Sequence, residues 1–474
     1  MKANLLKEYQ LRVCCIGAGY VGGPTMVVIA NHCPDILVNV VDIDQRKIDG
    51  WNCKDFKNLP VYEKGLESLL RKTRNKNLFF SNNVSEQISK ADLIFICVNT
   101  PTKKNGVGAG KASDLKWIEL CARQIAKYAK THTIVVEKST VPVKTAEVIE
   151  KILNQELINS NKTFSVLSNP EFLAEGSAIK DLENPQRVLI GGKDKKSLDL
   201  LSSIYSRWVE PKKIITTNLW SSELSKLTAN AFLAQKISSI NSITSLCEKT
   251  GAEINEVANA IGTDPRIGKE FLSAGPGFGG SCFKKDILNL SYLCEYYGLK
   301  EVADYWYGVL KINIWQQKRI SNLIIDKLNG TVSDKKIAIL GFSFKADTND
   351  TRESPAIDIC LNLLEEGANL AIHDPKVETH QIKKEFNERN YNESSKWIYS
   401  SNINEVINQS YAVILITEWA IYKQLKWKEL VKTMIKPAWI FDTRMVINEV
   451  ELIDANINYW RIGNKINSSS SNII

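Results

Sequence analysis

The 474-residue chain lacks the features that mark membrane and secreted proteins. It has no run of about 18 apolar residues, the length that a membrane-spanning helix requires. Its amino-terminal stretch leads into an expected strand without the apolar region of a signal peptide. We therefore expect a protein that neither spans a membrane nor carries a secretion signal.

Histidine motifs and paired cysteines are also scarce. The four histidines lie in no recognisable motif, which disfavours a dehydrogenase that uses histidine as its base. The ten cysteines form no CxxC pair, and no spacing of cysteine and histidine indicates a zinc site. Because Cys14 and Cys15 fall inside an expected core strand, the cysteines favour a reducing, cytoplasmic location, and we expect no metal.

The charged residues are not gathered into a block of one sign. The chain has 61 lysines and arginines against 53 acidic residues, a net charge of +8 that is spread along the sequence. A solvated surface accounts for this balance, although an anionic ligand also fits it, and we expect no nucleic-acid partner. With 44% apolar residues the chain can bury substantial cores, and its length suggests about two to four domains.

A dinucleotide-binding unit is predicted near the amino terminus. An apolar strand at 12–16 runs into Gly17-Ala18-Gly19-Tyr20-Val21-Gly22, which a helical stretch and a second strand at 37–41 follow. This order, ending in Asp42, is the fingerprint of a Rossmann unit that binds NAD. The glycines allow a pyrophosphate to approach the helix N-terminus. Asp42 would accept hydrogen bonds from the ribose hydroxyls of NAD and repel the additional phosphate of NADP.

Polar segments follow three of the next expected strands. These strands lie at 93–98, 134–137, 164–167 and 188–190 and alternate with helical stretches. The polar segments are Asn99-Thr100-Pro101-Thr102, Glu137-Lys138-Ser139-Thr140-Val141-Pro142 and Ser168-Asn169-Pro170-Glu171-Phe172-Leu173-Ala174-Glu175-Gly176. Each could be an ordinary strand-to-helix turn, but ligands of such sheets bind at the carboxyl ends of strands. Their shared position therefore favours the wall of a site.

The middle of the chain is expected to be helical. A long helix is predicted at 221–249, about 40 Å in length, with Lys226 and Asn230 on one face. A second long helix is predicted at about 302–328. Between them, Gly277-Phe278-Gly279-Gly280-Ser281-Cys282-Phe283-Lys284-Lys285-Asp286 places a thiol at the start of a helix, where the helix dipole lowers the pKa of a cysteine. The alternative is a glycine-rich turn whose cysteine is merely buried.

A second α/β region is predicted after residue 330. Strands at 336–340, 369–373, 412–417 and 439–441 repeat the alternation without a G-x-G-x-x-G. Basic residues follow these strands, and guanidinium and ammonium groups at that edge suit a diphosphate or carboxylate, although surface charge explains any one of them. They are Lys345, Arg352 and Arg444.

Taken together these motifs resemble the nucleotide-diphosphate-sugar 6-dehydrogenases, over about residues 12–461. The motifs are the glycine loop 17–24, Val98-Asn99-Thr100-Pro101-Thr102, the segments 137–142 and 169–176, Phe278-Gly279-Gly280-Ser281-Cys282-Phe283 and Thr351-Arg352-Glu353-Ser354. The resemblance implies an α/β protein with two Rossmann-like domains joined by a long central helix and a helical middle domain. It divides the chain into an NAD-binding domain at 1–217, a central dimerisation domain at 218–329 and a UDP-sugar-binding domain at 330–463. The remaining residues, 464–474, are expected to be a disordered tail.

The resemblance also implies the reaction, a two-step oxidation of a sugar C6 alcohol to a carboxylate with NAD. Cys282 would add to the C6 aldehyde, and hydrolysis of the resulting thioester would release the acid. Lys226, with Asn230 as its partner, would stabilise the oxyanion at C6. Asp286 and Thr140 would hold a water, and Glu171 would serve as acid and base.

The remaining site residues also follow from the resemblance. The cofactor-binding set is Gly17, Gly19, Tyr20, Val21, Gly22, Asp42, Val98, Asn99, Thr100, Ser139, Thr140, Glu175, Lys285 and Arg352. The substrate-binding set is Glu171, Phe172, Leu173, Lys226, Asn230, Arg266, Phe278, Gly279, Cys282, Phe283, Phe344, Lys345 and Arg444. Arg266 would reach the substrate of a neighbouring subunit, so we expect at least a dimer, and a hexamer is an open alternative.

Alternatives remain for the substrate and for the activity. The matches around Trp220-Ser221-Ser222-Glu223-Leu224-Ser225-Lys226 and Thr351-Arg352-Glu353-Ser354 favour UDP-glucose, but UDP-N-acetylmannosamine or GDP-mannose would use the same chemistry. A sensor that keeps the fold without catalysis would be expected to lack the thiol, Lys226 or Asp286, and all three are present. One departure is Lys47, which stands where many members have an arginine beside the adenosine.

Overall fold

The computed structural model describes residues 9–155, 162–174, 176–452, 455 and 457–465. The chain divides into two compact units, Met1–Ala229 and Asn230–Ile474, which are described one after the other. Within the described residues, no helix is long and apolar enough to cross a membrane. The predicted tail lies almost wholly outside them, with only 464 and 465 included.

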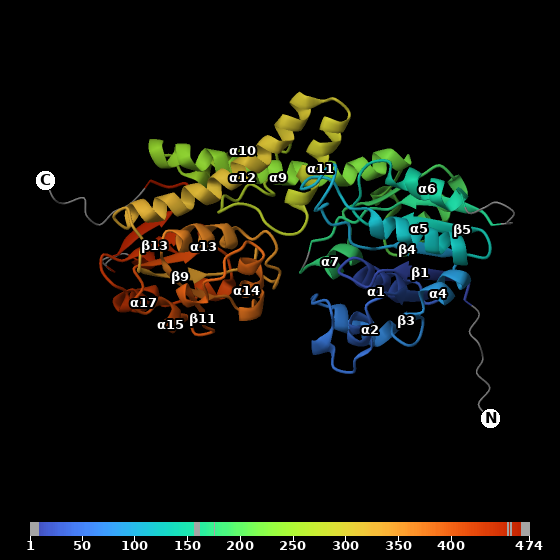
Figure 1. Ribbon diagram of the computed structural model, residues 1–474, viewed down its shortest axis with the longest axis horizontal. Helices are drawn as coiled ribbons and strands as arrows, with labels where there is room; N and C mark the ends of the chain where they lie inside the picture. The colour runs from blue at the N-terminus through green and yellow to red at the C-terminus, as the bar shows by residue number, and fades with distance from the viewer. Residues whose placement is uncertain (1–8, 156–161, 175, 453–454, 456, 466–474) are drawn as a thin grey trace. The chain divides into compact units, whose positions relative to one another are not determined.

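The first unit is a doubly wound α/β sheet of eight strands in the order β3-β2-β1-β4-β5-β6-β7-β8 (Figure 1, blue to green). All neighbouring strands are parallel except β6 and β7. The strands are β1 Leu11–Ile16, β2 Ile36–Val41, β3 Leu78–Ser81, β4 Leu93–Ile96, β5 Thr133–Glu137, β6 Phe164–Ser168, β7 Val188–Gly192 and β8 Ile214–Thr217. The helices are α1 Gly22–His32, α2 Gln45–Asn52, α3 Leu66–Thr73, α4 Val84–Lys90, α5 Lys116–Tyr128, α6 Thr145–Gln155, α7 Ala178–Glu183 and α8 Lys195–Tyr205.

Helices cover both faces of this sheet, which explains why its central strands are continuously apolar. Along β1, Val13 and Cys15 join the core under α1 and α3, whereas Cys14 and Ile16 join the core under α5 and α6. Successive side chains of a strand point to opposite faces, so a strand that is buried on both sides has no polar alternation. The carboxyl ends of β1, β2, β4, β5 and β6 therefore form one edge on a rigid support.

Long helices follow the first sheet, as the sequence predicted. Helix α9 runs over Leu219–Thr250 and passes the boundary between the two compact units at Ala229. It is followed by α10 Ile254–Gly262, α11 Phe283–Tyr296 and α12 Lys300–Lys327. Within the second unit, α11 and α12 pack with α9 around an apolar cluster that includes Ala231, Ile287 and Leu310.

The second unit also contains a parallel sheet, of six strands in the order β11-β10-β9-β12-β13-β14 (Figure 1, orange to red). Its strands are β9 Lys336–Leu340, β10 Asn369–His373, β11 Trp397–Tyr399, β12 Ala412–Leu415, β13 Trp439–Asp442 and β14 Asn458–Arg461. Its helices are α13 Pro355–Glu365, α14 Thr379–Asn387, α15 Ile403–Ile407, α16 Ala420–Lys423 and α17 Trp427–Leu430. The predicted fold class, two Rossmann-like sheets with long helices between them in sequence, is thus confirmed.

Candidate active site

The three glycines of the loop after β1 have different structural roles. Gly17 has φ +110, and a Cβ there would lie 2.2 Å from the carbonyl oxygen of Cys97. A Cβ on Gly22, the first residue of α1, would lie 2.0 Å from the carbonyl oxygen of Gly17. A Cβ on Gly19 would meet no heavy atom within 4 Å among the described residues. Gly17 and Gly22 are thus required for packing, whereas Gly19 leaves open space at the N-terminus of α1, as a bound pyrophosphate needs.

Asp42, directly after β2, is fixed beside this loop. Its Oδ2 accepts a hydrogen bond from the backbone N–H of Ala18 at 3.0 Å, and its Oδ1 accepts one from Asp44 at 2.9 Å. Lys47 Nζ lies 3.1 Å from the same carboxylate. Three donors do not exhaust the acceptor capacity of a carboxylate, so a ribose hydroxyl can still be bound. The residues of the glycine loop and Asp42 therefore fit the adenosine and diphosphate parts of NAD.

The turns after β4 and β5 are tied to each other. Ser139 Oγ donates a hydrogen bond to the carbonyl of Val98 at 2.8 Å, and Thr100 Oγ1 donates one to the carbonyl of Thr140 at 2.7 Å. Asn99 is exposed between Val98 and the buried Thr100. Tyr20 and Val21 are half-buried in the glycine loop. All the cofactor residues predicted in segments 17–42, 98–100 and 139–140 therefore lie at the carboxyl edge of one sheet.

A buried lysine fixes the segment that carries Glu171. Lys138 Nζ donates to the carbonyl oxygen of Asn169 at 3.1 Å and to its side-chain oxygen at 3.0 Å. Tyr205 donates to the same side-chain oxygen at 2.7 Å, and Asn169 in turn donates to the carbonyl of Leu189. Because Lys138 and Asn169 are almost completely buried, these bonds hold the turn after β6 rigidly.

Thr140, Glu171 and Lys226 meet in the first unit. Glu171 Oε1 lies 3.4 Å from the hydroxyl of Thr140 and 3.4 Å from Nζ of Lys226, which is in the first part of α9. Glu171 and Lys226 are both buried, so this ion pair is little screened by solvent. The structure thus brings together three of the six predicted catalytic residues.

Phe172 provides an aromatic surface for two cations beside this cluster. Lys226 Nζ lies 5.3 Å from the centre of its ring, and the guanidinium of Arg187 lies 3.8 Å from it. Burial lowers the pKa of Arg187. Leu173, next in the chain, packs against the core of the sheet. Glu175, which was predicted to bind the cofactor, lies outside the described residues.

The cysteine loop is built within the second unit. Gly277 and Gly280 have φ +127 and +83, which favour glycine, and a Cβ on Gly279 would lie 2.4 Å from the carbonyl oxygen of Glu353. Asn313, on α12, accepts a hydrogen bond from the N–H of Phe278 at 2.8 Å and donates one to its carbonyl at 3.1 Å. The loop therefore depends on its glycines for conformation and close packing.

Cys282 is the residue directly before α11 and is half-buried. Its Sγ lies 3.5 Å from the hydroxyl of Ser281. The predicted position of the thiol at a helix N-terminus is therefore confirmed, and the expected lowering of its pKa stays a prediction. Phe283, the first residue of α11, packs edge to face on Phe278 at 5.7 Å between ring centres.

Asp286 lies one turn into α11 and is almost completely buried. Asn230, on α9, donates a hydrogen bond to Asp286 Oδ2 at 2.6 Å, and Lys285 Nζ lies 3.9 Å from Oδ1. Two further predicted catalytic residues, Asn230 and Asp286, are thus in direct contact. They belong to the second unit, whereas Thr140, Glu171 and Lys226 belong to the first.

The predicted substrate residues of the second sheet surround the loop after β9. Arg444, after β13, donates from Nε to the carbonyl of Ile416 at 2.8 Å and pairs with Glu418 at 3.1 Å. Lys345 Nζ lies 5.5 Å from the centre of the Phe344 ring. Both cations are half-buried at the carboxyl edge of the sheet. An edge of this kind can bind an anionic group.

Arg352 and Arg266 have different surroundings. Arg352 pairs with Asp350 at 2.6 Å, and its carbonyl accepts a hydrogen bond from the N–H of Gly280, which connects it to the cysteine loop. Arg266, beyond α10, pairs only with the adjacent Asp264 among the described residues, and its side chain is 87% exposed. The structure of this chain therefore does not bring Arg266 to the other predicted substrate residues.

Sequence reasoning missed several residues that shape the site. Lys138 stood in a motif but was not assigned a task, because a lysine after a strand is usually exposed and its burial is not visible in the sequence. Arg187 lay in no motif, and Glu223 stood in the matched stretch 220–226 but was not assigned a role. Glu223 accepts hydrogen bonds from the backbone N–H groups of Lys144 and Ala146, both at 2.7 Å, and so fixes the start of α6. The signal for Glu223 was weak, a single acid one turn before Lys226.

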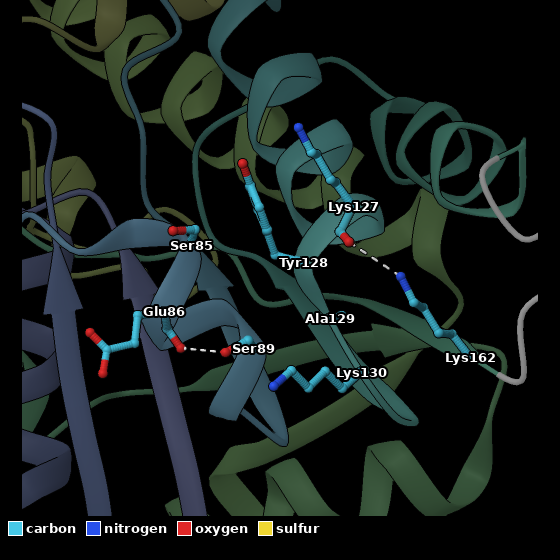
Figure 2. A pocket seen from close by; sticks show the side chains of 8 residues that line it. All are labelled: Ser85, Glu86, Ser89, Lys127, Tyr128, Ala129, Lys130 and Lys162. Carbon is cyan, nitrogen blue, oxygen red and sulfur yellow. Dashed lines mark hydrogen bonds between the residues drawn. The ribbon is translucent and has the colours of Figure 1, made fainter.

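A separate hollow of about 550 Å³ lies at the opposite edge of the first sheet. Figure 2 shows it between α4 and the end of α5, with Lys162 turned to the carbonyl of Lys127. These segments precede β4, β5 and β6 and are therefore at the amino ends of the strands. Because ligands of doubly wound sheets bind at the carboxyl ends, this hollow is not the candidate site.

Comparisons with known proteins agree with this arrangement. Three models of the UDP-glucose/GDP-mannose dehydrogenase family match the chain, namely the NAD binding domain at 11–209, the central domain at 220–315 and the UDP binding domain at 338–449. The UDP-glucose 6-dehydrogenase of Bos taurus is 52% identical over 469 residues, which cover 96% of this chain and 94% of the relative. UDP-glucose 6-dehydrogenase 1 of Arabidopsis thaliana is 50% identical over 476 residues, which cover 97% of this chain and 98% of the relative.

Solved structures show the same relationship. The UDP-glucose dehydrogenase of Pyrobaculum islandicum superposes with a TM-score of 0.82 at 27% identity, covering 97% of this chain and 98% of that one. A UDP-D-ManNAc dehydrogenase of Pyrococcus horikoshii superposes with a TM-score of 0.79 at 25% identity, covering 96% and 99%. The glycine loop, the Glu171 cluster and the cysteine loop thus lie on a chain that belongs to the UDP-glucose/GDP-mannose dehydrogenase family.

Proposed function

We propose that this protein is an NAD-dependent UDP-glucose 6-dehydrogenase, which oxidises the C6 alcohol of UDP-glucose to the carboxylate of UDP-glucuronate. Relatives with this name are about half identical over nearly the whole chain. The observation that carries the chemistry is the buried contact of Glu171 with Lys226 and Thr140, in the same unit as the glycine loop. It combines an acid or base with a cation able to stabilise an oxyanion.

The cofactor assignment rests on the fit of the first sheet to NAD. The open space at Gly19, the remaining acceptor capacity of Asp42 and the turns after β4 and β5 would hold it. Bound NAD supplies the acceptor for the hydrides that leave C6 in the two oxidation steps. Lys285 and Arg352 are assigned to the cofactor through the family resemblance, as is Glu175.

Cys282 is the proposed nucleophile. Its sulfur forms a bond to C6 of the aldehyde, and the oxygen that becomes negative is stabilised by Lys226, with Asn230 as its partner. Loss of a hydride from C6 converts this adduct into a thioester. Asp286 and Thr140 hold the water that attacks the thioester, Glu171 takes and returns the proton, and the C–S bond breaks to give the acid and the thiol.

The second sheet is the proposed site for the UDP part of the substrate. The family model for this region is a UDP binding domain, and Lys345 and Arg444 provide positive charge at its carboxyl edge. Phe278, Gly279, Phe283 and Phe344 are assigned to the sugar and its diphosphate through the resemblance, together with Phe172 and Leu173. UDP-N-acetylmannosamine and GDP-mannose are the alternative substrates.

The domain organisation and the assembly are part of the proposal. We assign NAD binding to 1–217, self-association to 218–329 and UDP-sugar binding to 330–463. Large apolar side chains of the central helices support a dimer, because Phe232, Leu246 and Tyr296 are 53%, 59% and 71% exposed in the single chain. The exposed Arg266 would then act on the partner's substrate, and the enzyme would work in the cytoplasm.

The test counts NADH formed per sugar consumed with a panel of nucleotide sugars. Two NADH for each UDP-glucose support the proposal, whereas one NADH, or turnover only with another sugar, would contradict it. Cys282→Ser should lower turnover to acid by roughly 1000-fold or more while NAD binding persists. Cys53→Ser is the matched control, because Cys53 is the other half-buried cysteine, and it should keep wild-type turnover.

A further inference from the structure

Glu137, the last residue of β5, is a buried acid, and one of its carboxyl oxygens has no hydrogen-bond partner among the described residues. It is 1% exposed, and its Oε1 accepts no hydrogen bond from any residue that the structure describes. Within the same residues, it forms no ion pair either. Ser168, which faces it in register on β6, has a hydroxyl that is likewise buried without a partner among them. An ionised carboxylate in such surroundings is strongly destabilised.

The other charged groups of this region have charged or hydrogen-bonding partners. Glu171 pairs with Lys226 through Oε1, although its Oε2 is also buried without a hydrogen bond among the described residues, and Glu223 accepts two backbone hydrogen bonds. Lys138 is held by both oxygens of Asn169. The region thus contains three buried carboxyl groups and two buried ammonium groups. A proton on Glu137 removes one negative charge from this region.

We propose that Glu137 holds a proton in the working enzyme and is a positioning residue for Glu171. As a neutral acid, Glu137 leaves a negative charge on Glu171, which therefore keeps its ion pair with Lys226. If Glu137 were ionised as well, its charge would repel that of Glu171 and compete with it for the attraction of Lys226. The ion pair of Glu171 with Lys226 would then be weakened, and Glu171 would no longer be held in place to accept a proton from the attacking water. This inference rests on the role proposed above for Glu171.

The charged surroundings of Glu137 agree with a held proton. Burial, and then the carboxyl groups of Glu223 and Glu171 and the thiol of Cys97, raise the pKa of Glu137 well above its ordinary value. Lys138 alone lowers the pKa, and it is the weakest of these influences.

The first experiment measures the proton directly in the wild-type enzyme. An infrared difference spectrum between wild type and Glu137→Gln, at neutral pH, should contain the carbonyl stretch of a protonated carboxylic acid, which shifts in heavy water. Carboxylate bands in its place would overturn the inference. This measurement needs no turnover, so it is informative even if UDP-glucose is not the substrate.

The second experiment compares the same isosteric change at two carboxyl groups. Because only neutrality is required, Glu137→Gln and Glu137→Met should both keep kcat within about threefold of wild type, whereas Glu171→Gln should lose roughly 100-fold. In wild type, kcat should fall at high pH as Glu137 ionises, and in both Glu137 variants this limb should move up by at least about one pH unit. A large loss of kcat in both folded Glu137 variants, or an unchanged limb, would contradict the inference. Glu137→Met covers the case that a buried amide prevents folding.

Discussion

The two α/β units share the order of their first six strands, but the acid that follows the second strand has different surroundings in each. Asp42 follows β2 and Asp374 follows β10. Asp42 receives two backbone hydrogen bonds and one from Lys47, and is 8% exposed. Asp374 is 1% exposed and receives hydrogen bonds from Phe342, Ser343, Trp419, Lys376 and Val377. Position in the sheet alone therefore does not make such an acid a ribose ligand.

The loops after the first strand of each sheet also differ in how much space they leave for a ligand. In the first unit Gly19 faces open space, whereas in the second unit the residue after Gly341 is Phe342, which is completely buried. Phe342 packs in the apolar core of the second unit, whereas the residue after Gly17 is the smaller Ala18, which is also buried. The same sheet topology can therefore place an acid where it binds a ligand or where it stabilises its own loop. The side chains around the acid determine which of these two roles it has.

The largest effect is expected from Asp374→Ala. Its loss leaves several buried donors unsatisfied, at about 1–3 kcal/mol for each, so the free energy of unfolding of the second unit should fall by about 3–5 kcal/mol. Guanidinium denaturation followed by tryptophan fluorescence measures this loss. Asp42→Ala is the matched variant, and it should cost about 1 kcal/mol while lowering NAD affinity at least about tenfold. If the two substitutions lowered the free energy of unfolding equally, Asp42 and Asp374 would not differ in their contribution to stability.

The next largest loss of stability is expected from substitutions of closely packed glycines. Gly22→Ala and Gly341→Ala should each destabilise their unit by at least about 2 kcal/mol, because the new methyl would lie 2.0 Å from Gly17 O and 2.4 Å from Thr417 Cβ. Gly19→Ala should keep the melting temperature and weaken NAD binding, as measured by calorimetry. A Gly19→Ala variant that binds NAD normally would show that the pyrophosphate does not use this space.

The first unit should also respond to pH through Glu223. Burial raises the pKa of Glu223 to about 7 in spite of its backbone hydrogen bonds. The folded state then keeps a proton that the unfolded chain has already released, so the free energy of unfolding should fall as pH rises from about 4.5 to about 7, by at most about 3 kcal/mol. Denaturation at several pH values should show a smaller fall in Glu223→Gln than in wild type. An unchanged slope would exclude Glu223 as its source.

The smallest effect is expected from Lys47→Ala. Lys47 is 39% exposed, and a pair of this kind contributes at most about 1 kcal/mol to stability. Removal of its positive charge should weaken NAD binding only a few-fold, which calorimetry resolves. A loss as large as that of Asp42→Ala would mean that Lys47 itself contacts the cofactor.

Most of the architecture was readable from apolar runs and glycines. The strands expected at 12–16, 37–41 and 336–340 and the long helix at 221–249 are present within two residues of their predicted ends. The short strands β3, β8, β11 and β14 were missed. All are at or near sheet edges and have three or four residues, too few to show a pattern.

The site was predictable in its residue types but not in its contacts. The motifs supplied Cys282, Glu171 and Asp286, because their spacing from glycines and strand ends is visible in the sequence. The burial of Glu137 and Lys138 was not visible, since both follow apolar residues as exposed turn residues also do. Such burial depends on which segments pack above a strand end, and that is a property of the whole sheet.

The burial of the cysteines has a consequence for chemical labelling. Eight of the ten are buried, and only Cys53 and Cys282 are half-buried. Burial raises the pKa of Cys33 to about 11 and that of Cys121 to about 12. Although the chain has ten thiols, most of them should therefore react very slowly with alkylating reagents, because these reagents attack thiolates. Once Cys53 is replaced, Cys282 is the one cysteine that is not buried. It can then be labelled in the native protein while the eight buried cysteines are left in place.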